Sequence, residues 1–209
     1  MKGRDKYAKQ WRAFRAYLEQ CDELPTTFED AYAVVANKVS GLYREEAEAL
    51  WNVLANEDVF EFVEIGRNLG GTQFLIGCCC QANLLSIESY DIEYFDTTDD
   101  YFPEFWDRFG IACACHTGDS TRLTPSDHIR DFVFIDGGHT GEIVKRDIEI
   151  WGDKTRFIGF HDYADRKTNK HKRYYPYVVY EISKAAQERG WKQIGKRGKS
   201  EVVFRTGAR

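Results

Sequence analysis

The 209-residue sequence has no excess of basic residues, no long hydrophobic run and no internal repeat. Its 29 Lys and Arg against 34 Asp and Glu give a net charge of −5, which argues against non-specific nucleic-acid binding. No stretch approaches the roughly 18 apolar residues of a membrane helix, and the charged segment 1–17 has no signal-peptide core. We therefore expect a cytoplasmic protein that binds neither nucleic acid nor membrane.

The cysteines lack the spacing of a zinc site, because the sequence contains no C-x-x-C pair. Cys113 and Cys115 stand two apart, so on a strand they would share a face. We interpret all six as reduced, buried thiols in a reducing cytosol. They are Cys21, Cys78, Cys79, Cys80, Cys113 and Cys115.

Apolar residues make up 43% of the chain, and over residues 1–57 they recur at helical spacing. The stripes are Tyr7, Trp11, Phe14 and Leu18, followed by Phe28, Tyr32, Val35 and Val39. A third helix is expected over Leu42–Asn56, with Leu50, Trp51 and Leu54 inward and Glu45, Glu46 and Glu48 outward. We predict an N-terminal helical extension (1–57) that is a candidate interface for a homo-oligomer.

From residue 58 onward, short apolar runs alternate with amphipathic segments. This alternation is typical of a doubly wound, mostly parallel sheet covered by helices. We predict an α/β domain over 58–209 with a Rossmann-like, seven-stranded sheet. The expected strands are 59–65, 84–87, 111–115, 132–135, 156–160, 191–194 and 201–205, and the expected helices are 71–80, 103–108, 142–151 and 174–189.

Polar residues directly follow three of these strands. The apolar run 132–135 leads into Asp136, two glycines and His139, while Glu64 and the pair His161-Asp162 stand at two other strand ends. Open α/β sheets bind their ligands at the carboxyl ends of the strands. These side chains therefore predict a site at that edge.

The turn after the first strand contains Gly66, Gly70 and Gly71. A dinucleotide-binding fingerprint would need G-x-G-x-x-G, but Asn68 stands where the middle glycine belongs. No Gly-Lys-Ser/Thr closes the turn, which excludes a P-loop. The turn is either an ordinary strand-to-helix connection or a place where the backbone approaches a ligand closely.

Two further acidic residues stand near expected strand ends. Glu88 closes the second strand about 20 positions after the glycine turn, where a carboxylate can bind the hydroxyls of a ribose. Asp119 follows the third strand and is either an ordinary turn residue or a partner for the amino group of an adenine. We expect Glu64, Glu88, Asp119 and Asp136 to gather along one edge of the sheet.

This ordered set of strand ends resembles the class I S-adenosylmethionine-dependent methyltransferases, and within them the macrolide-sugar and cephalosporin-type O-methyltransferases. The likeness spans residues 59–163, and one departure is Asn68, where many relatives carry glycine. The segments that carry it are VEIG (63–66) with GGT (70–72), SIE (86–88), GDS (118–120), FIDGGH (134–139) with Asp147, and FHDY (160–163).

The resemblance implies that S-adenosylmethionine is the cofactor. Its cationic sulfonium suits an acidic pocket that lacks phosphate-binding lysines. By the same resemblance, the methionine end is held by Glu64, Gly66, Gly70, Gly71 and Thr72, the ribose by Glu88, and the adenine region by Asp119 and Ser120.

Asp136, His161 and Asp162 have two interpretations. Metal-assisted relatives hold Mg²⁺ at these strand ends, where the ion lowers the pKa of a substrate hydroxyl. Those relatives usually carry an acidic residue at the position of His161, and an imidazole suits Mn²⁺ or Fe²⁺ better. In the alternative interpretation, His161 and Asp162 cap the fifth strand and hydrogen-bond each other.

His139 resembles the general base of the sugar O-methyltransferases, because it lies three residues after Asp136 on the same loop. An imidazole that titrates near neutral pH can take the proton of an attacking hydroxyl. The resemblance therefore implies a catalytic role for His139, together with Asp136.

We predict a methyltransferase that acts on a hydroxyl of a small molecule or sugar. The basic run 166–173 could guide an anionic substrate, and whether the aromatic segment 90–109 is a lid stays open. Two alternatives stay open, a cephalosporin-hydroxylase-like enzyme and a methyltransferase-like fold used as a non-catalytic binding or assembly module. The glycine spacing disfavours a nicotinamide-dependent reductase.

Overall fold

The computed structural model describes residues 2–36, 39, 41–91, 101–124, 126–163, 175–195 and 201–208. Its strands are β1 (Glu61–Ile65), β2 (Ser86–Asp91), β3 (Ala112–Thr117), β4 (Arg130–Ile135), β5 (Thr155–Phe160), β6 (Lys192–Gly195) and β7 (Val202–Arg205). They form one sheet of seven strands in the order β3-β2-β1-β4-β5-β7-β6. Strands β1 to β5 are parallel, and β7 runs antiparallel to both β5 and β6. The predicted α/β fold with a mostly parallel sheet is confirmed.

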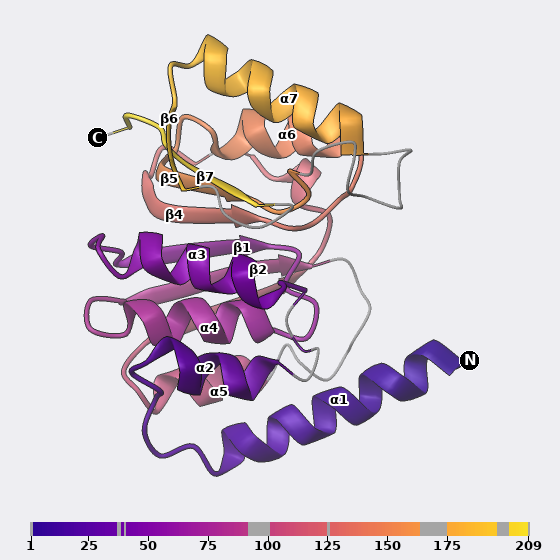
Figure 1. Ribbon diagram of the computed structural model, residues 1–209, viewed down its shortest axis with the longest axis vertical. Helices are drawn as coiled ribbons and strands as arrows, with labels where there is room; N and C mark the ends of the chain where they lie inside the picture. The colour runs from indigo at the N-terminus through magenta and orange to yellow at the C-terminus, as the bar shows by residue number, and fades with distance from the viewer. Residues whose placement is uncertain are drawn as a thin grey trace.

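Helices cover both faces of this sheet, as Figure 1 shows, with α6 and α7 on one side and α3 and α4 on the other. The helices are α1 (Lys2–Glu19), α2 (Phe28–Val35), α3 (Arg44–Leu54), α4 (Gly71–Cys80), α5 (Tyr101–Asp107), α6 (Gly141–Trp151) and α7 (Tyr175–Glu188), with the short 3₁₀ turn η1 (Ser120–Arg122). No helix among these described residues is long and apolar enough to cross a membrane.

Strand β4 explains why the sheet has two hydrophobic faces. Phe132 and Phe134 belong to the cluster under α1 to α5, whereas Val133 and Ile135 belong to the cluster under α6 and α7. Successive side chains of a strand point to opposite faces, so a strand that is apolar at every position must be covered on both. The continuous apolar run in the sequence is the cause of this three-layer arrangement.

The N-terminal helices pack into the same core as the sheet. Trp11, Phe14 and Leu18 are buried as their spacing predicts, but Tyr7 at the start of the stripe is 40% exposed. The ring of Phe14 lies 5.6 Å from that of Phe74 on α4 in an edge-to-face contact. Residues from α1, α2 and α3 therefore share one hydrophobic cluster with α4 and α5.

Some predicted boundaries are wrong. The second strand was expected over 84–87 but runs to Asp91, because its pairing with β3 continues as far as Thr117. Helix α2 ends at Val35, so Val39 is buried outside the helix that was expected to carry it. The basic run 166–173 lies outside the described residues, and so do residues 92–100 of the aromatic segment 90–109.

All six cysteines lie in the described residues and have free thiols. Cys21, Cys78 and Cys80 are buried, while Cys79, Cys113 and Cys115 are only partly so. The two cysteines of β3 do share a face, with their sulfur atoms 3.9 Å apart.

Candidate active site

Three polar strand ends meet at one edge of the sheet. Gly66, Asp136 and His161 each follow the last residue of β1, β4 and β5 respectively. The amide of Asp136 donates to the carbonyl of Ile65 at 2.8 Å, and the amide of His161 donates to the carbonyl of Ile135 at 3.0 Å. The parallel ladder thus continues one residue past the strands and fixes these positions side by side.

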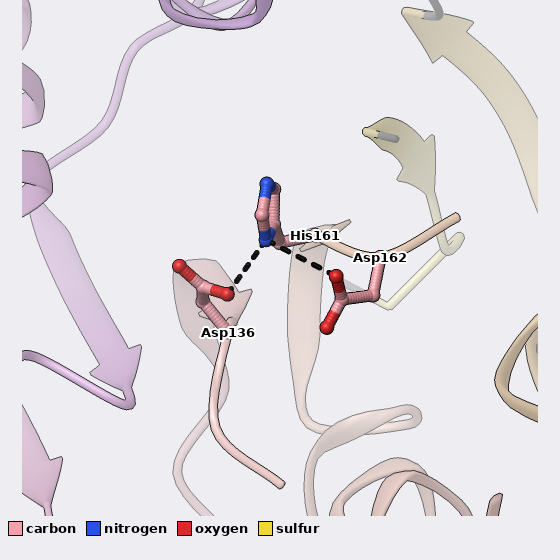
Figure 2. Close-up of side chains that lie close together, drawn as sticks. All are labelled: Asp136, His161 and Asp162. Carbon is pink, nitrogen blue, oxygen red and sulfur yellow. Dashed lines mark ion pairs between the residues drawn. The ribbon is translucent and has the colours of Figure 1, made fainter. Parts of the chain in front are cut away.

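Asp136, His161 and Asp162 form a compact group, drawn in Figure 2. The Nδ1 atom of His161 lies 2.8 Å from Oδ1 of Asp136 and 3.6 Å from Oδ1 of Asp162. One ligand atom from each residue lies within 4.8 Å of the other two. Two carboxylates and an imidazole at this spacing have the geometry to hold a divalent cation.

Asp162 links this group to His139. It is one of the non-glycine residues with a left-handed backbone (φ 62°), and its Oδ2 accepts a short hydrogen bond from the Nδ1–H of His139. That hydrogen bond raises the pKa of His139 above its ordinary value. The side chain of His139 is 59% exposed, so a substrate can reach it.

Glu46 was predicted to face solvent, and that prediction is wrong. It is 1% exposed, and its Oε2 lies 3.6 Å from Nε2 of His161. The reason is local, because Glu46 sits in the first turn of α3 and its carboxylate accepts the amide of Tyr43 at 2.9 Å, which turns it toward the sheet edge. Helical periodicity alone does not reveal that a charged cap of this kind is buried.

Glu201 is a second carboxylate that sequence patterning did not single out. It is 3% exposed, and burial together with the charge of Glu46 raises its pKa to about 9. Burial by itself lowers the pKa of His161, but the carboxylates of Asp136, Glu46 and Asp162 outweigh it and raise that pKa to about 11.

The glycine turn packs directly against Asp136. A Cβ atom on Gly66, whose φ is 93°, would lie 2.4 Å from the carbonyl oxygen of Asp136, and one on Gly70 would lie 2.2 Å from the ring of Phe102. Asn68 adopts a φ of 51°, a left-handed conformation that Asn tolerates, so it can stand where relatives carry glycine.

Glu64 belongs to β1 and stands two residues before Gly66. Its side chain is 1% exposed, and Oε2 has no hydrogen-bond partner among the described residues. Burial, with the nearby charge of Asp136 second, raises its pKa well above the ordinary value. Gly71 and Thr72 begin α4 as predicted. The amide of Gly71 donates a hydrogen bond to the carbonyl of Val39 at 3.1 Å, and the side chain of Thr72 is buried.

Glu88 does not close the second strand. It lies in the middle of β2, and its carboxylate is paired at 2.8 Å with Arg130, the first residue of β4. That pairing directs the Glu88 side chain toward the amino-terminal ends of the strands. Asp91 is the true strand end, and its Oδ2 accepts the amide of Asn68 in the glycine turn at 2.5 Å. Asp91, and not Glu88, is therefore the carboxylate that stands beside the glycine turn.

Asp119 and Ser120 follow β3 as predicted, and both are engaged locally. Oδ1 of the exposed Asp119 caps η1 by accepting the amide of Thr121 at 3.0 Å. The hydroxyl of Ser120 donates to the buried carboxylate of Asp147 at 2.8 Å. An adenine contact by either residue stays a prediction, and so does a ribose contact by Glu88. Of the four carboxylates expected along one edge, Glu88 is the one that pairs with Arg130 at the start of β4.

This strand order, with β7 inserted antiparallel beside β5 and polar residues at the carboxyl ends of β1, β2, β4 and β5, defines a Rossmann-like methyltransferase fold. Residues 63–163, just under half of the chain, match a family model described as a methyltransferase domain. The domain match and the fold together indicate an S-adenosylmethionine-dependent transferase. No curated protein sequence matches the chain.

Solved structures with a similar fold include several methyltransferases. A proposed caffeoyl-CoA O-methyltransferase from Staphylococcus aureus has a TM-score of 0.63 at 12% identity over 87% of this chain and 93% of its own. An S-adenosylhomocysteine-bound methyltransferase from Podospora anserina has a TM-score of 0.59 at 11% identity, covering 92% and 93%. An O-methyltransferase from Bacillus cereus in complex with S-adenosylhomocysteine has 0.53 at 14%, covering 88% and 92%. The resemblance to macrolide-sugar and cephalosporin-type enzymes stays a prediction.

Proposed function

We propose that this protein transfers the methyl group of S-adenosylmethionine to a hydroxyl group of a small molecule or sugar. The observation that carries the proposal is the contact between the Gly66 turn and Asp136, where a single added carbon would meet the Asp136 carbonyl at 2.4 Å. The turn expected to hold the methyl donor thus adjoins the loop that carries His139. The O-methyltransferase structures of similar fold support the choice of oxygen as acceptor.

The residues around the turn fit this cofactor. The buried Glu64 has an oxygen without a hydrogen-bond partner in the described chain, and Asp91 at the end of β2 is placed to accept ribose hydroxyls. When bound, S-adenosylmethionine supplies a methyl group on a cationic sulfur. The acidic residues at this edge favour that charge, and the rigid turn orients the methyl group for in-line attack.

His139 acts as the general base in this proposal. Its Nδ1–H donates to Asp162, which leaves Nε2 to take the proton of the substrate hydroxyl as the oxygen attacks the methyl carbon. The carboxylate of Asp162 then stabilises the imidazolium that forms. This is the role that an acidic partner plays for a catalytic histidine in other enzymes.

Asp136, His161 and Asp162 are the residues that would hold a divalent cation. A bound Mg²⁺, Mn²⁺ or Fe²⁺ would supply a Lewis acid that lowers the pKa of the substrate hydroxyl. The mixed oxygen and nitrogen donor set favours Mn²⁺ or Fe²⁺ over Mg²⁺.

Calorimetric titration of the full chain with S-adenosylhomocysteine, with and without Mn²⁺, tests the cofactor and metal parts separately. We expect micromolar binding of the nucleoside, and formation of S-adenosylhomocysteine when the protein is incubated with S-adenosylmethionine and a panel of polyhydroxylated compounds. Absence of binding at millimolar ligand would overturn the proposal. Binding without turnover on any acceptor, unaffected by H139A, would instead favour a non-catalytic binding module.

A further inference from the structure

We propose that Glu46 is a positioning residue that fixes the ring orientation of His161 and so decides which of its nitrogens faces the cation site, with Glu201 as a second carboxyl group beside it. The consequence for catalysis depends on the proposed function, because His161 is there one of three residues that hold a divalent cation. The geometry of the imidazole and its neighbours stands independently of that function.

The two nitrogens of His161 face different partners. Nδ1 points at Asp136 and Asp162, and Figure 2 shows the other ring nitrogen directed away from both carboxylates. That second nitrogen, Nε2, lies 3.6 Å from Oε2 of Glu46. With Nε2 turned to Glu46, Nδ1 is the ring nitrogen that faces a cation held between Asp136 and Asp162. The second hydrogen bond of a metal-binding histidine fixes its ring orientation in this way.

Glu46 is rigid enough for this role. Its carboxylate also accepts the amide of Tyr43 at 2.9 Å, and the next residue, Ala47, is completely buried. A side chain that caps a helix can bond a backbone amide while it remains in water. Burying a carboxylate is costly without a partner, so the 1% exposure of Glu46 points to a role beyond the cap.

Glu201 lies beside His161, directly before the neighbouring strand, β7. Phe160 pairs with Val202 in the antiparallel ladder of β5 and β7, so Glu201 stands opposite His161. Its side chain is 3% exposed, and its Oε2 has no hydrogen-bond partner among the described residues. Glu201 is therefore a second buried carboxyl group whose charged neighbours are Glu46 and His161.

The N-terminal helical segment therefore contributes a residue to the candidate site at the carboxyl ends of the strands. Glu46 belongs to α3, within residues 1–57, whereas Asp136, His161 and Asp162 belong to the sheet domain. A cation site built this way depends on how α3 packs against the sheet. Changes in the α3 contacts would alter the site without touching any residue that binds the cation.

The substitution E46Q separates positioning from capping. Gln can still accept the amide of Tyr43, because Glu and Gln both serve at this helix position, but it carries no charge toward His161. We expect Mn²⁺, titrated alone into the full chain by calorimetry, to bind about 10-fold more weakly to E46Q than to the wild type. The matched control E45Q removes an exposed carboxylate from the same helical turn and should leave the affinity unchanged.

A metal-free measurement keeps this inference distinct from the proposed function. Long-range ¹H–¹⁵N spectra of the imidazole groups should show His161 protonated on Nε2 in the wild type, with that nitrogen resonance displaced in E46Q and not in E45Q. Unchanged His161 resonances in E46Q would show that Glu46 only caps the helix. If the wild type binds no Mn²⁺, the metal part of the proposed function fails, and the spectra still decide the role of Glu46.

Discussion

The hydroxyl of Ser120 donates a 2.8 Å hydrogen bond to Oδ1 of Asp147, a carboxylate with no exposed surface. This contact joins the loop after β3 to helix α6. Oδ2 of Asp147 has no hydrogen-bond partner among the described residues, and burial raises the pKa of this group to about 6. The folded protein thus holds the protonated form of Asp147 more tightly than the unfolded chain does.

The stability of the protein should fall as this group ionises. Because the folded pKa lies above the unfolded one of 3.8, the contribution is full below pH 4 and is lost as the pH rises through about 6. D147N keeps an acceptor for Ser120 and removes the charge. We expect the free energy of unfolding of D147N to exceed that of the wild type by about 3 kcal/mol at pH 8 and to differ little from it at pH 4. Urea unfolding at both pH values measures this, and a gain of equal size at pH 4 would contradict it.

H139A should abolish most methyl transfer without loss of cofactor binding. Removal of a general base typically lowers kcat by about 10²- to 10⁴-fold. The affinity for S-adenosylhomocysteine should stay within about twofold, since His139 is not among the residues expected to hold the cofactor. Calorimetry and a turnover assay on the same preparation check both. Equal activity of H139A and wild type would remove His139 from the mechanism.

The activity should increase with pH across the acid limb of the profile. A general base must be unprotonated, and the hydrogen bond from His139 to Asp162 raises the pKa of His139 above 6.5. We therefore expect the midpoint of the limb in kcat/KM to lie above 6.5. A profile that is flat between pH 6 and 9 would count against a histidine base.

Asp91, rather than Glu88, should control cofactor affinity. D91N removes a carboxylate at the end of β2 and should weaken S-adenosylhomocysteine binding by about 10- to 100-fold, as expected for loss of charged hydrogen bonds. E88Q is the matched control, because Glu88 is paired with Arg130, the first residue of β4. We expect this substitution to lower the stability of the fold and to leave the affinity unchanged. Calorimetric dissociation constants for both variants decide between the two carboxylates, and the reverse order would restore Glu88.

G66A should destabilise the protein far more than G110A. Both glycines have positive φ, 93° and 73°, but an added Cβ at Gly66 meets the Asp136 backbone at 2.4 Å whereas at Gly110 it meets nothing within 4 Å. G110A measures the conformational cost alone, about 1–2 kcal/mol. G66A adds a clash and should cost at least about 3 kcal/mol. Similar unfolding free energies for the two variants would show that the turn can move away from Asp136.

The sequence by itself determined the fold class and most of the strand ends that make up the candidate site. Alternating apolar runs set the sheet and its covering helices, since a strand that is apolar at every position must be buried on both faces. The predicted runs end before Gly66, Asp136 and His161, as the strands do in the structure, because the apolar side chains that cover both faces of the sheet stop there. Because β1, β4 and β5 are parallel neighbours, these three residues must lie side by side at one edge of the sheet.

Only the tertiary structure decided which carboxylates turn toward that edge. Glu88 and Asp91 lie three residues apart on one strand, so their roles depend on how far pairing with β3 extends and on the distant Arg130. Glu46 and Glu201 lie far from His161 in the sequence, and contacts made by α3 and β7 bring them to it. Local periodicity specifies the face of a single element, whereas the burial of a charge depends on partners that packing supplies from elsewhere in the chain.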